Sequence, residues 1–366
     1  MSEIKLIPIK NIKEGMICGD PVLDNLGRHL VERGAVINAY IIENLKKYGI
    51  EAIPILFLSK TQDLKPQQKI SPAILHTIRE LRRGDPPKVT LSKHARKKIA
   101  QDIEKVYHFS SPHEIATAAT DVTKDLYKAI ESNNAVAINL NDLRISDEYT
   151  YKHSIDVAVL SMMIAKQMNY STREIYEIGE AGLLHDIGKT RIPPEILNKP
   201  ARLTDEEFKI MKQHSYFSYA MVENNHEIPR SVARAMMQHH EKLNGSGYPL
   251  GLKKNEIHPY AKILAVADIY DALVTERPYK KAKTPREAIE MMYGMISELD
   301  ENVLKAFLQA LVPYPVDSTL LLSNGELARV VRRTPGYPLR PVVVGLTSGN
   351  VYNLTEIDRA NIVIES

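Results

Sequence analysis

The pattern of apolar and polar positions divides the chain into a mixed N-terminal part, a long helical middle and a β-rich end. Residues 16–23 and 50–58 have the apolar content of short strands, and residues 24–27 between them form a turn candidate that leads into another strand. Residues 37–48 show helical spacing of apolar positions. These elements predict a small α/β module near the N-terminus.

The middle of the chain is predicted to be helical. Residues 91–132 have mostly helical periodicity with a break near residues 109–112, and a helix-rich block then continues to about residue 311. Three capping boxes, each with Ser or Thr followed three positions later by Glu, mark helix starts. They begin at Ser171, Thr204 and Thr284. We therefore expect several helices of about 10 to 20 residues each.

The pattern changes to β after residue 313. Residues 320–322 and 327–331 flank Asn324-Gly325, and Asn-Gly is a strong signal for a tight hairpin. Residues 342–344 and 351–352 flank a second short turn in the same way. The tail is predicted to be a small β extension.

Together these patterns predict a mainly α protein with a small mixed α/β N-terminal module and a short β C-terminal extension. The chain is long enough for two or three domains. We place the module at residues 1–60, a linker and helical connector at 61–112, the main helical domain at 113–312 and the β extension at 313–366.

Composition narrows the functional classes. The 366 residues are 44% hydrophobic and 25% charged, which is typical of a folded globular protein. A formal net charge of +3 gives no sign of a nucleic acid polymer or a membrane surface as partner. The single Cys18 fits a reducing compartment, and no apolar run approaches the roughly 20 residues of a membrane span. The first residues lack the apolar stretch of a signal peptide, so we expect a cytoplasmic protein.

Several histidines and aspartates occupy positions where helices would bury them. His153 opens an apolar helix whose periodicity directs the imidazole inwards, although a structural histidine would explain this equally well. The adjacent pair His185 and Asp186 ends another apolar helix. Such a pair is weak evidence alone, but Lys189 strengthens it, because a cation there could hold a phosphate.

Further candidates follow along the chain. His214 is expected inside the helix that begins after Thr204, where an ordinary surface histidine is the competing explanation. His239 and His240 are expected on a helix, where neighbouring side chains diverge by about 100°, so they could bind two metals or one. Asp268 lies in an apolar helix and needs a cation partner, which a structural salt bridge would also supply.

As a set, these residues indicate a metal centre. They supply seven N and O ligand groups, from His153, His185, Asp186, His214, His239, His240 and Asp268. That exceeds the four ligands of a structural zinc site, and cysteine ligands are missing. Imidazole and carboxylate together suit iron, manganese or zinc. Two metals about 3.5–4 Å apart, bridged by Asp186, would activate a hydroxide for phosphodiester hydrolysis.

These residues resemble the motifs of a known family. His-Asp-Ile-Gly-Lys at residues 185–189 is similar to the signature of the HD superfamily of metal-dependent phosphohydrolases. Residues 239–249, with His-His at the start and Gly-Tyr-Pro at the end, resemble the extended signature of the HD-GYP subfamily. Further motifs match at residues 192–193, 196–200, 268–273 and 277–280. The resemblance covers roughly residues 150 to 290.

The resemblance implies a bundle of α-helices at residues 113–312 and hydrolysis of cyclic di-GMP to linear pGpG, to GMP, or to both. The seven residues above match the family's metal ligands. Asp186 and Lys189 match the catalytic positions, with the lysine near the scissile phosphate. The positions expected to bind substrate are Lys189, Gly247, Tyr248, Pro249, Arg277 and Lys280.

The resemblance also implies two divalent transition metals per chain, with iron or manganese favoured over zinc. Some family members add a glutamate one turn before the first histidine to support a third metal. Here Tyr149 occupies that position, and Glu148 lies on a different helix face. Asp271, one turn after Asp268, is another candidate for a third metal, but we predict two.

Two alternatives stay open at this point. One is a signalling module that binds a cyclic dinucleotide or a partner protein without turnover. The other is an HD-type hydrolase of mononucleotides or of a mixed guanine–adenine cyclic dinucleotide. The N-terminal segment resembles small modules that precede this domain in many bacterial proteins, and its position suggests a role in regulation or homodimer formation.

Overall fold

The computed structural model describes most of the chain, which divides into two compact units, Met1–Ile70 and Ser71–Ser366. The described residues are 3–12, 16, 18, 22–23, 29–31, 37, 41–42, 45–46, 48–57, 70–91, 93–109, 111–133, 135, 137–138, 152–275, 282–359 and 361–365.

The first unit is built around an antiparallel pair of strands, β1 (Glu3–Pro8) and β4 (Ala52–Phe57). A 3₁₀ turn, η1 (Ile9–Asn11), follows β1, and β2 (Val22–Leu23) pairs with β3 (His29–Val31). β4 lies within the strand predicted at residues 50–58. The turn predicted at residues 24–27 lies outside the described residues.

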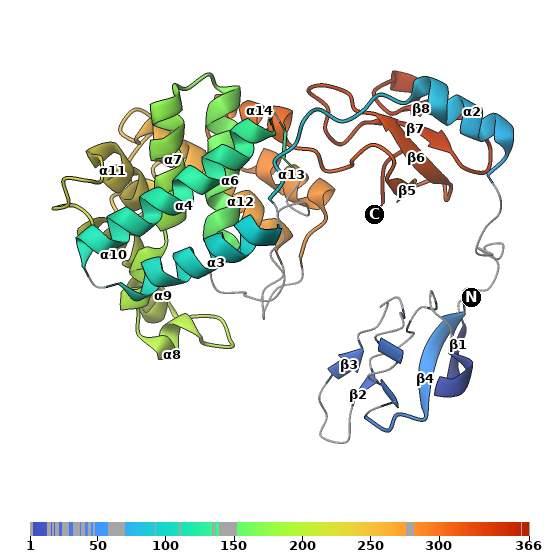
Figure 1. Ribbon diagram of the computed structural model, residues 1–366, viewed down its shortest axis with the longest axis horizontal. Coiled ribbons are helices and arrows are strands. Elements are labelled where there is room, and N and C mark those ends of the chain that lie inside the picture. Colours follow the sequence, from blue (N-terminus) through green and yellow to red (C-terminus); the bar gives the residue numbers. More distant parts are fainter. Residues whose placement is uncertain are drawn as a thin grey trace. The chain divides into compact units, whose positions relative to one another are not determined.

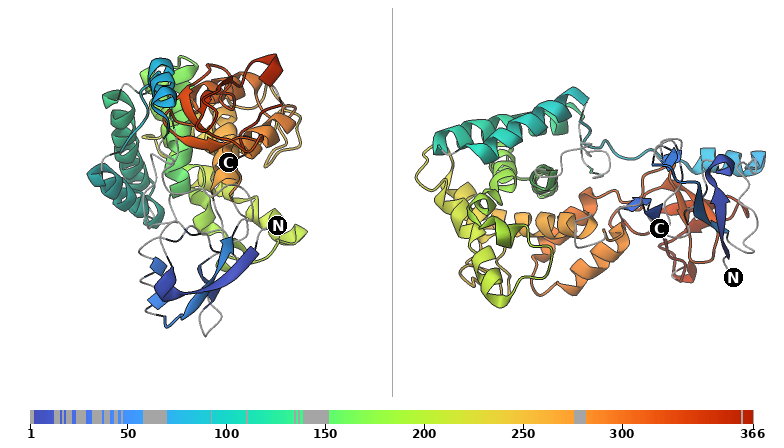
Figure 2. Two further views of the ribbon diagram at one scale, coloured as in Figure 1. Left: turned by 90° about the vertical axis from the view of Figure 1, so that its right-hand side faces the viewer. Right: turned by 90° about the horizontal axis from the view of Figure 1, so that it is seen from below.

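The second unit contains a helical bundle (Figure 1). Its elements in chain order are α3 (Lys93–His108), α4 (Pro112–Ser132), α6 (Lys152–Gln167), α7 (Thr172–Leu184), η2 (Ile187–Arg191), α8 (Pro194–Leu197), α9 (Asp205–Met211), α10 (His214–Ala220), α11 (Arg230–Gln238), α12 (Pro259–Val274), α13 (Pro285–Gly294) and α14 (Glu301–Ala310). The long helices α3 and α4 pack against each other (Figures 1 and 2). The predicted break near residues 109–112 separates them.

The helix starts follow the sequence signals. In all three predicted capping boxes the side chain of Ser171, Thr204 or Thr284 accepts a hydrogen bond from the backbone of the glutamate three residues later. Each glutamate carboxylate in turn accepts from the backbone N–H of the capping residue. These caps satisfy backbone donors that the first helical turn leaves unpaired.

Helix α6 lies at the centre of the bundle and contacts α4, α7, α12 and α14. Every residue of α6 from 154 to 165 is buried, as expected for a helix that is apolar on all sides. Gly182 allows α7 to approach closely, because a Cβ on this residue would lie 2.9 Å from the Cα of Ala158 in α6. The close packing of α6 and α7 brings the first turn of one helix next to the last turn of the other.

A four-stranded antiparallel sheet follows the bundle, in the order β5 (Thr319–Leu321), β6 (Leu327–Arg332), β7 (Val342–Gly345) and β8 (Val351–Asn353). Both predicted hairpins are present, and Gly325 has the positive φ of 82° that its turn requires. Helix α2 (Pro72–Leu81) packs on β6 and β7 (Figure 1), and the short η3 (Ile357–Arg359) lies near the end of the chain.

The expected fold class is therefore confirmed: the chain is mainly α, with small antiparallel sheets near both ends of the sequence. Across the described residues, no helix combines the length and the apolar character needed to span a bilayer.

Candidate metal centre

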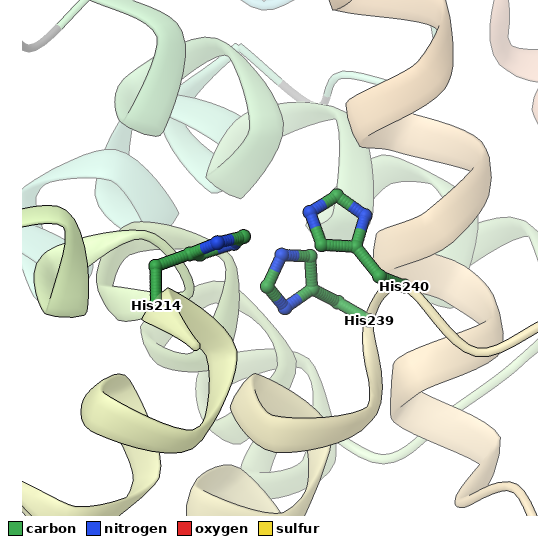
Figure 3. Close-up of side chains that lie close together, drawn as sticks. All are labelled: His214, His239 and His240. Atoms are coloured by element: carbon green, nitrogen blue, oxygen red, sulfur yellow. The ribbon is translucent and has the colours of Figure 1, made fainter. Parts of the chain in front are cut away.

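All seven predicted ligands lie together in the bundle, six of them at or just beyond helix ends and Asp268 within a helix. His153 is in the first turn of α6, His185 and Asp186 follow α7, and Asp268 lies in α12. The other three ligands are His214, His239 and His240 (Figure 3). Residues that are far apart in sequence thus form one cluster in which five of the seven members are buried, while His153 and His240 lie at its more exposed side.

Two of the sequence-based placements were wrong in detail. His214 does not lie in the helix that begins after Thr204, since α9 ends at Met211 and His214 starts α10. The Gln213 N–H bonds to the carbonyl of Ile210, so the chain tightens into a 3₁₀-type turn between the two helices. This turn gives His214 a direction that a continuous α9 would not give.

The histidine pair also lies beyond its expected helix. Helix α11 ends at Gln238, and the backbone N–H of Glu241 bonds back to the Gln238 carbonyl in a turn. The rings of His239 and His240 do not diverge as on a helix, because their centroids are only 4.0 Å apart with planes at 44° (Figure 3). Both imidazoles are therefore available to one cluster.

Three of the imidazoles are oriented by the same local device. The Nδ1 atoms of His185, His214 and His239 lie 2.6–2.7 Å from the backbone carbonyl three residues earlier. A carbonyl only accepts, so Nδ1 carries the proton and Nε2 keeps its lone pair. All three Nε2 atoms are buried and have no hydrogen-bond partner among the described residues. Buried acceptors left unpaired in this way fit a metal ion.

The charge state of His214, His239 and His240 agrees with this role. Burial lowers the pKa of His214, and it lowers that of His239 well below the usual range. Burial likewise lowers the pKa of His240 to about 4, with Asp268 opposing the shift. At neutral pH these imidazoles are neutral, which is the form that binds metals.

Asp186 occupies the middle of the cluster. Its two oxygens lie 3.3 Å from Nε2 of His185 and 3.3 Å from Nε2 of His214, and one lies 2.5 Å from Nζ of Lys189. Burial opposes ionisation, but Lys189 and the histidines outweigh it and hold the pKa of Asp186 well below its usual range. Asp186 is thus an anion with histidines on both sides.

His153 is held between two aspartates of α12. Its Nε2 lies 3.2 Å from Asp268, and its Nδ1 lies 2.6 Å from Asp271, which is fully buried. Burial lowers the pKa of His153, but hydrogen bonds to both aspartates raise it to about 10. Asp271, considered above as support for a third metal, contacts the nitrogen of His153 that faces away from Asp268 and orients the ring.

The donor set therefore fits metal ions. The described residues contain three groups whose ligand atoms lie within 4.8 Å of one another. The groups are His214, His239 and His240; His153, His185 and Asp268; and His185, Asp186 and His239. The first two groups share no residue, and Asp186 contacts His185 of one and His214 of the other.

The Gly-Tyr-Pro loop lies directly beside the cluster. The ring of Tyr248 is 4.6 Å from that of His240, and the Tyr248 N–H bonds to the His240 carbonyl at 3.2 Å. Gly247 has to be glycine here, since a Cβ would lie 2.4 Å from the backbone nitrogen of Lys242. Pro249 follows Tyr248 in the same loop. Arg277 and Lys280 lie outside the described residues, as do Glu148 and Tyr149.

Sequence reasoning missed two residues that shape the site. The buried carboxylate of Glu241 accepts hydrogen bonds from the backbone N–H groups of Leu250 at 2.7 Å and Leu252 at 2.9 Å, which fixes the end of the loop. Glu241 directly follows the histidine pair, and this adjacency was the signal that could have identified it.

The second missed residue is Ser218 of α10. Its hydroxyl donates to the His185 carbonyl at 2.7 Å and accepts from the Gly188 N–H at 2.8 Å. A Cβ on Gly188 would lie 2.1 Å from the carbonyl oxygen of His214, so glycine is needed for α10 to approach. A serine inside a helix carries no recognisable signal in a single sequence.

Comparison with known proteins identifies similar sequences. The model of the HD domain matches residues 126–303. A cyclic di-GMP phosphodiesterase of Pseudomonas aeruginosa is 31% identical over 345 residues, which cover 90% of this chain and 82% of that protein. A 3'3'-cGAMP-specific phosphodiesterase of Vibrio cholerae is 35% identical over 179 residues, covering 49% of this chain and 39% of that protein.

Among solved structures, a HDG"Y"P protein from Bdellovibrio bacteriovorus superposes with a TM-score of 0.50 over 83% of this chain and 98% of that chain. Its sequence identity of 16% makes this a likeness of fold alone. Because the match is 31% identical and covers 82% of the Pseudomonas protein, the chain belongs to the HD domain family of phosphohydrolases, as an HD-GYP member. It is a hydrolase of the phosphodiesterase class.

Proposed function

We propose that this chain hydrolyses cyclic di-GMP to linear pGpG, to GMP, or to both, at a binuclear metal centre. The observation that carries the proposal is the position of Asp186 between two separate groups of buried ligands. A carboxylate in this place suits a pair of metals, and metal pairs suit in-line attack on a phosphodiester. The name of the Pseudomonas relative supports the choice of substrate.

The ligand groups support two metal positions. In this proposal His153, His185 and Asp268 hold one metal, and His214, His239 and His240 hold the other, with Asp186 shared. Imidazole and carboxylate oxygen without thiolate favour iron or manganese and permit zinc. Bound metals would lower the pKa of a water to near neutrality and neutralise charge on the phosphoryl group.

The chain's own residues would then position the substrate. The Lys189 side chain is one-third exposed and lies beside Asp186, so its ammonium can bind a phosphate oxygen at the edge of the centre. Tyr248 stands against His240 and limits the space available to the ligand on that side. The seven ligands, the catalytic roles of Asp186 and Lys189, and the phosphate contacts of Arg277 and Lys280 all belong to this proposal.

A second candidate substrate is a mixed guanine–adenine cyclic dinucleotide. The Vibrio relative is named as a phosphodiesterase specific for such a dinucleotide, and it is 35% identical over the shared segment. The proposed metal centre would not distinguish the two substrates, because it would act on the phosphodiester and not on the base.

The test begins with the full chain purified without oxygen and analysed for bound metals. Cyclic di-GMP and the mixed dinucleotide are then incubated separately with the protein, and products are followed by chromatography. Two iron or manganese ions per chain and release of pGpG or GMP are expected. Metal without turnover, after reconstitution with iron and manganese, would contradict the proposal and favour a binding module.

A further inference from the structure

A lysine ammonium lies between two aromatic rings at the edge of the metal centre. Nζ of Lys212 is 4.7 Å from the ring centroid of Phe208 and 5.5 Å from that of Tyr248. The two rings meet edge to face, with centroids 6.4 Å apart and planes at 78°. Such contacts attract a cation to the negative faces of the rings.

This group adjoins the ligands directly. The Tyr248 ring lies 4.6 Å from that of His240, and Lys212 precedes His214 by two residues in the turn between α9 and α10. Phe208 keeps 44% of its surface exposed although it is a large apolar residue. An aromatic surface is therefore open to solvent within reach of the site that would cleave the substrate.

The ammonium of Lys212 also has unused donors. Among the described residues no carboxylate lies within ion-pair distance of its Nζ, whereas Lys199 is paired with Glu207 at 2.6 Å and Lys242 with Glu298 at 2.7 Å. Ring faces attract the charge but do not replace oxygen or nitrogen acceptors for the three N–H bonds. The exposed ring of Phe208 and the N–H donors of Lys212 therefore suit a flat ligand that carries hydrogen-bond acceptors.

We propose that Phe208 and Lys212 form the guanine-binding subsite of this enzyme, in which Phe208 stacks on the base and Lys212 donates to its O6 and N7 atoms. The proposal rests on the proposed function and adds the part of the substrate that this group recognises. A guanine edge offers two acceptors, whereas adenine places an amino donor where guanine has O6. The Lys212 ammonium would repel that donor, so the subsite favours guanine.

A phosphate is the competing ligand for Lys212. Phosphate gains nothing from an aromatic surface, and the ammonium of Lys189 already stands at the central carboxylate where the scissile group would bind. A base uses both the exposed ring and the cation, because its flat face stacks on aromatic side chains while its edge accepts hydrogen bonds. The combination of Phe208 with Lys212 therefore favours guanine.

The test measures binding of two matched ligands to the manganese-loaded full chain. Phosphorothioate analogues of cyclic di-GMP and cyclic di-AMP, with one sulfur on each phosphate, resist hydrolysis and differ only in the bases. Dissociation constants are determined by calorimetry for the unchanged chain and for Lys212→Ala, Phe208→Ala and Lys209→Ala. Lys209 is an exposed residue of the same helix outside the ring contacts and serves as the control.

For Lys212→Ala we expect the dissociation constant to rise about tenfold or more for the guanine ligand and less than about threefold for the adenine ligand. Phe208→Ala should weaken the binding of both ligands, because stacking depends little on which base is present. Lys209→Ala should change neither. Metal content and melting temperature of each variant show that the centre and the fold are intact.

Equal weakening of both ligands in Lys212→Ala would overturn the guanine assignment and identify Lys212 as a phosphate contact. No weakening in either variant, or no binding of either ligand by the unchanged chain, would overturn the subsite. Hydrolysis of unmodified cyclic di-GMP is measured separately. Selective binding without hydrolysis would contradict the proposed function while leaving the subsite supported.

Discussion

Asp271 lies 2.6 Å from Nδ1 of His153 and thereby sets the direction in which that imidazole presents Nε2 to the metal centre. Its other oxygen accepts a hydrogen bond from the Thr275 hydroxyl at 3.0 Å, so the aspartate is itself fixed. Ligand histidines with such partners keep one ring orientation and become more basic. Asp271 is a positioning residue whose effect passes through His153.

This relationship predicts the behaviour of Asp271→Asn. The amide can still contact His153 but carries no charge, so we expect metal affinity or activity to fall by about 10–100-fold with the fold retained. Metal titration against a chromophoric chelator measures the affinity. Thr275→Val, which removes only the outer hydrogen bond, should cause a smaller loss, and an unchanged metal affinity in Asp271→Asn would refute the positioning role.

Asp186→Asn should have a larger effect. The substitution keeps the shape of the side chain and removes the anion shared by the two ligand groups, so we expect at least about a hundredfold loss of turnover and a lower metal content. Product release from cyclic di-GMP and metal analysis on the same sample give both quantities. Turnover close to that of the unchanged chain would show that the centre does not need a carboxylate here.

Gly188→Ala should destabilise the protein because α10 leaves no room for a methyl group. The added Cβ would lie 2.1 Å from the His214 carbonyl oxygen, and crowding of this kind costs about 1–3 kcal/mol. Urea unfolding measures the loss. Gly294→Ala is the matched control, since no atom lies within 4 Å of a Cβ there, and it should be neutral or slightly stabilising. Similar stability of both variants would contradict the packing argument.

Glu241→Ala should loosen the Gly-Tyr-Pro loop without removing a ligand. It leaves the N–H groups of Leu250 and Leu252 without the carboxylate that accepts from both, so the end of the loop loses its attachment. We expect a raised KM for cyclic di-GMP at nearly unchanged metal content. Glu241→Gln keeps one acceptor oxygen, so its KM should lie between those of Glu241→Ala and the unchanged chain. Equal kinetics of Glu241→Ala and the unchanged chain would contradict this role.

The buried carboxyl of Glu180, which lies outside the metal centre, should make the stability of the protein depend on pH. This α7 residue is buried against Thr120, and burial raises its pKa to about 7 from the ordinary 4.5. The folded state therefore binds the proton more tightly than the unfolded state, so the charged form destabilises the fold above about pH 7. That penalty disappears as the pH falls from 7 towards 4.5.

Glu180→Gln should accordingly stabilise the protein at pH 8 and have little effect near pH 4.5. Urea unfolding at a series of pH values measures the difference between the variant and the unchanged chain. Thr120→Val removes the hydroxyl that donates to the carboxylate at 3.0 Å and should raise the pKa of Glu180 further. In a chain that carries Thr120→Val, the stability gained by Glu180→Gln at pH 8 should therefore be larger. A difference independent of pH would mean that Glu180 does not titrate in this range.

The residue types and spacing determined the local structure and the composition of the site. The three capping boxes and the Asn-Gly hairpin were confirmed because each depends on hydrogen bonds between residues a few positions apart. The seven candidate ligands were identifiable because buried histidines and aspartates on apolar helices need partners. The boundary of α9 was misplaced because a 3₁₀ turn leaves no mark in apolar periodicity.

Only the tertiary structure decided how these groups meet. The contacts of His153 with Asp271 and of Ser218 with His185 join residues that are 118 and 33 positions apart. No local pattern records such pairs, because they depend on how closely whole helices pack, as at Gly182 and Gly188. The sequence by itself determined which side chains could bind metal, and backbone carbonyls three residues earlier orient three of the imidazoles locally. The packing of the helices decided which rings share one cluster and, through Asp271, which nitrogen of His153 faces it.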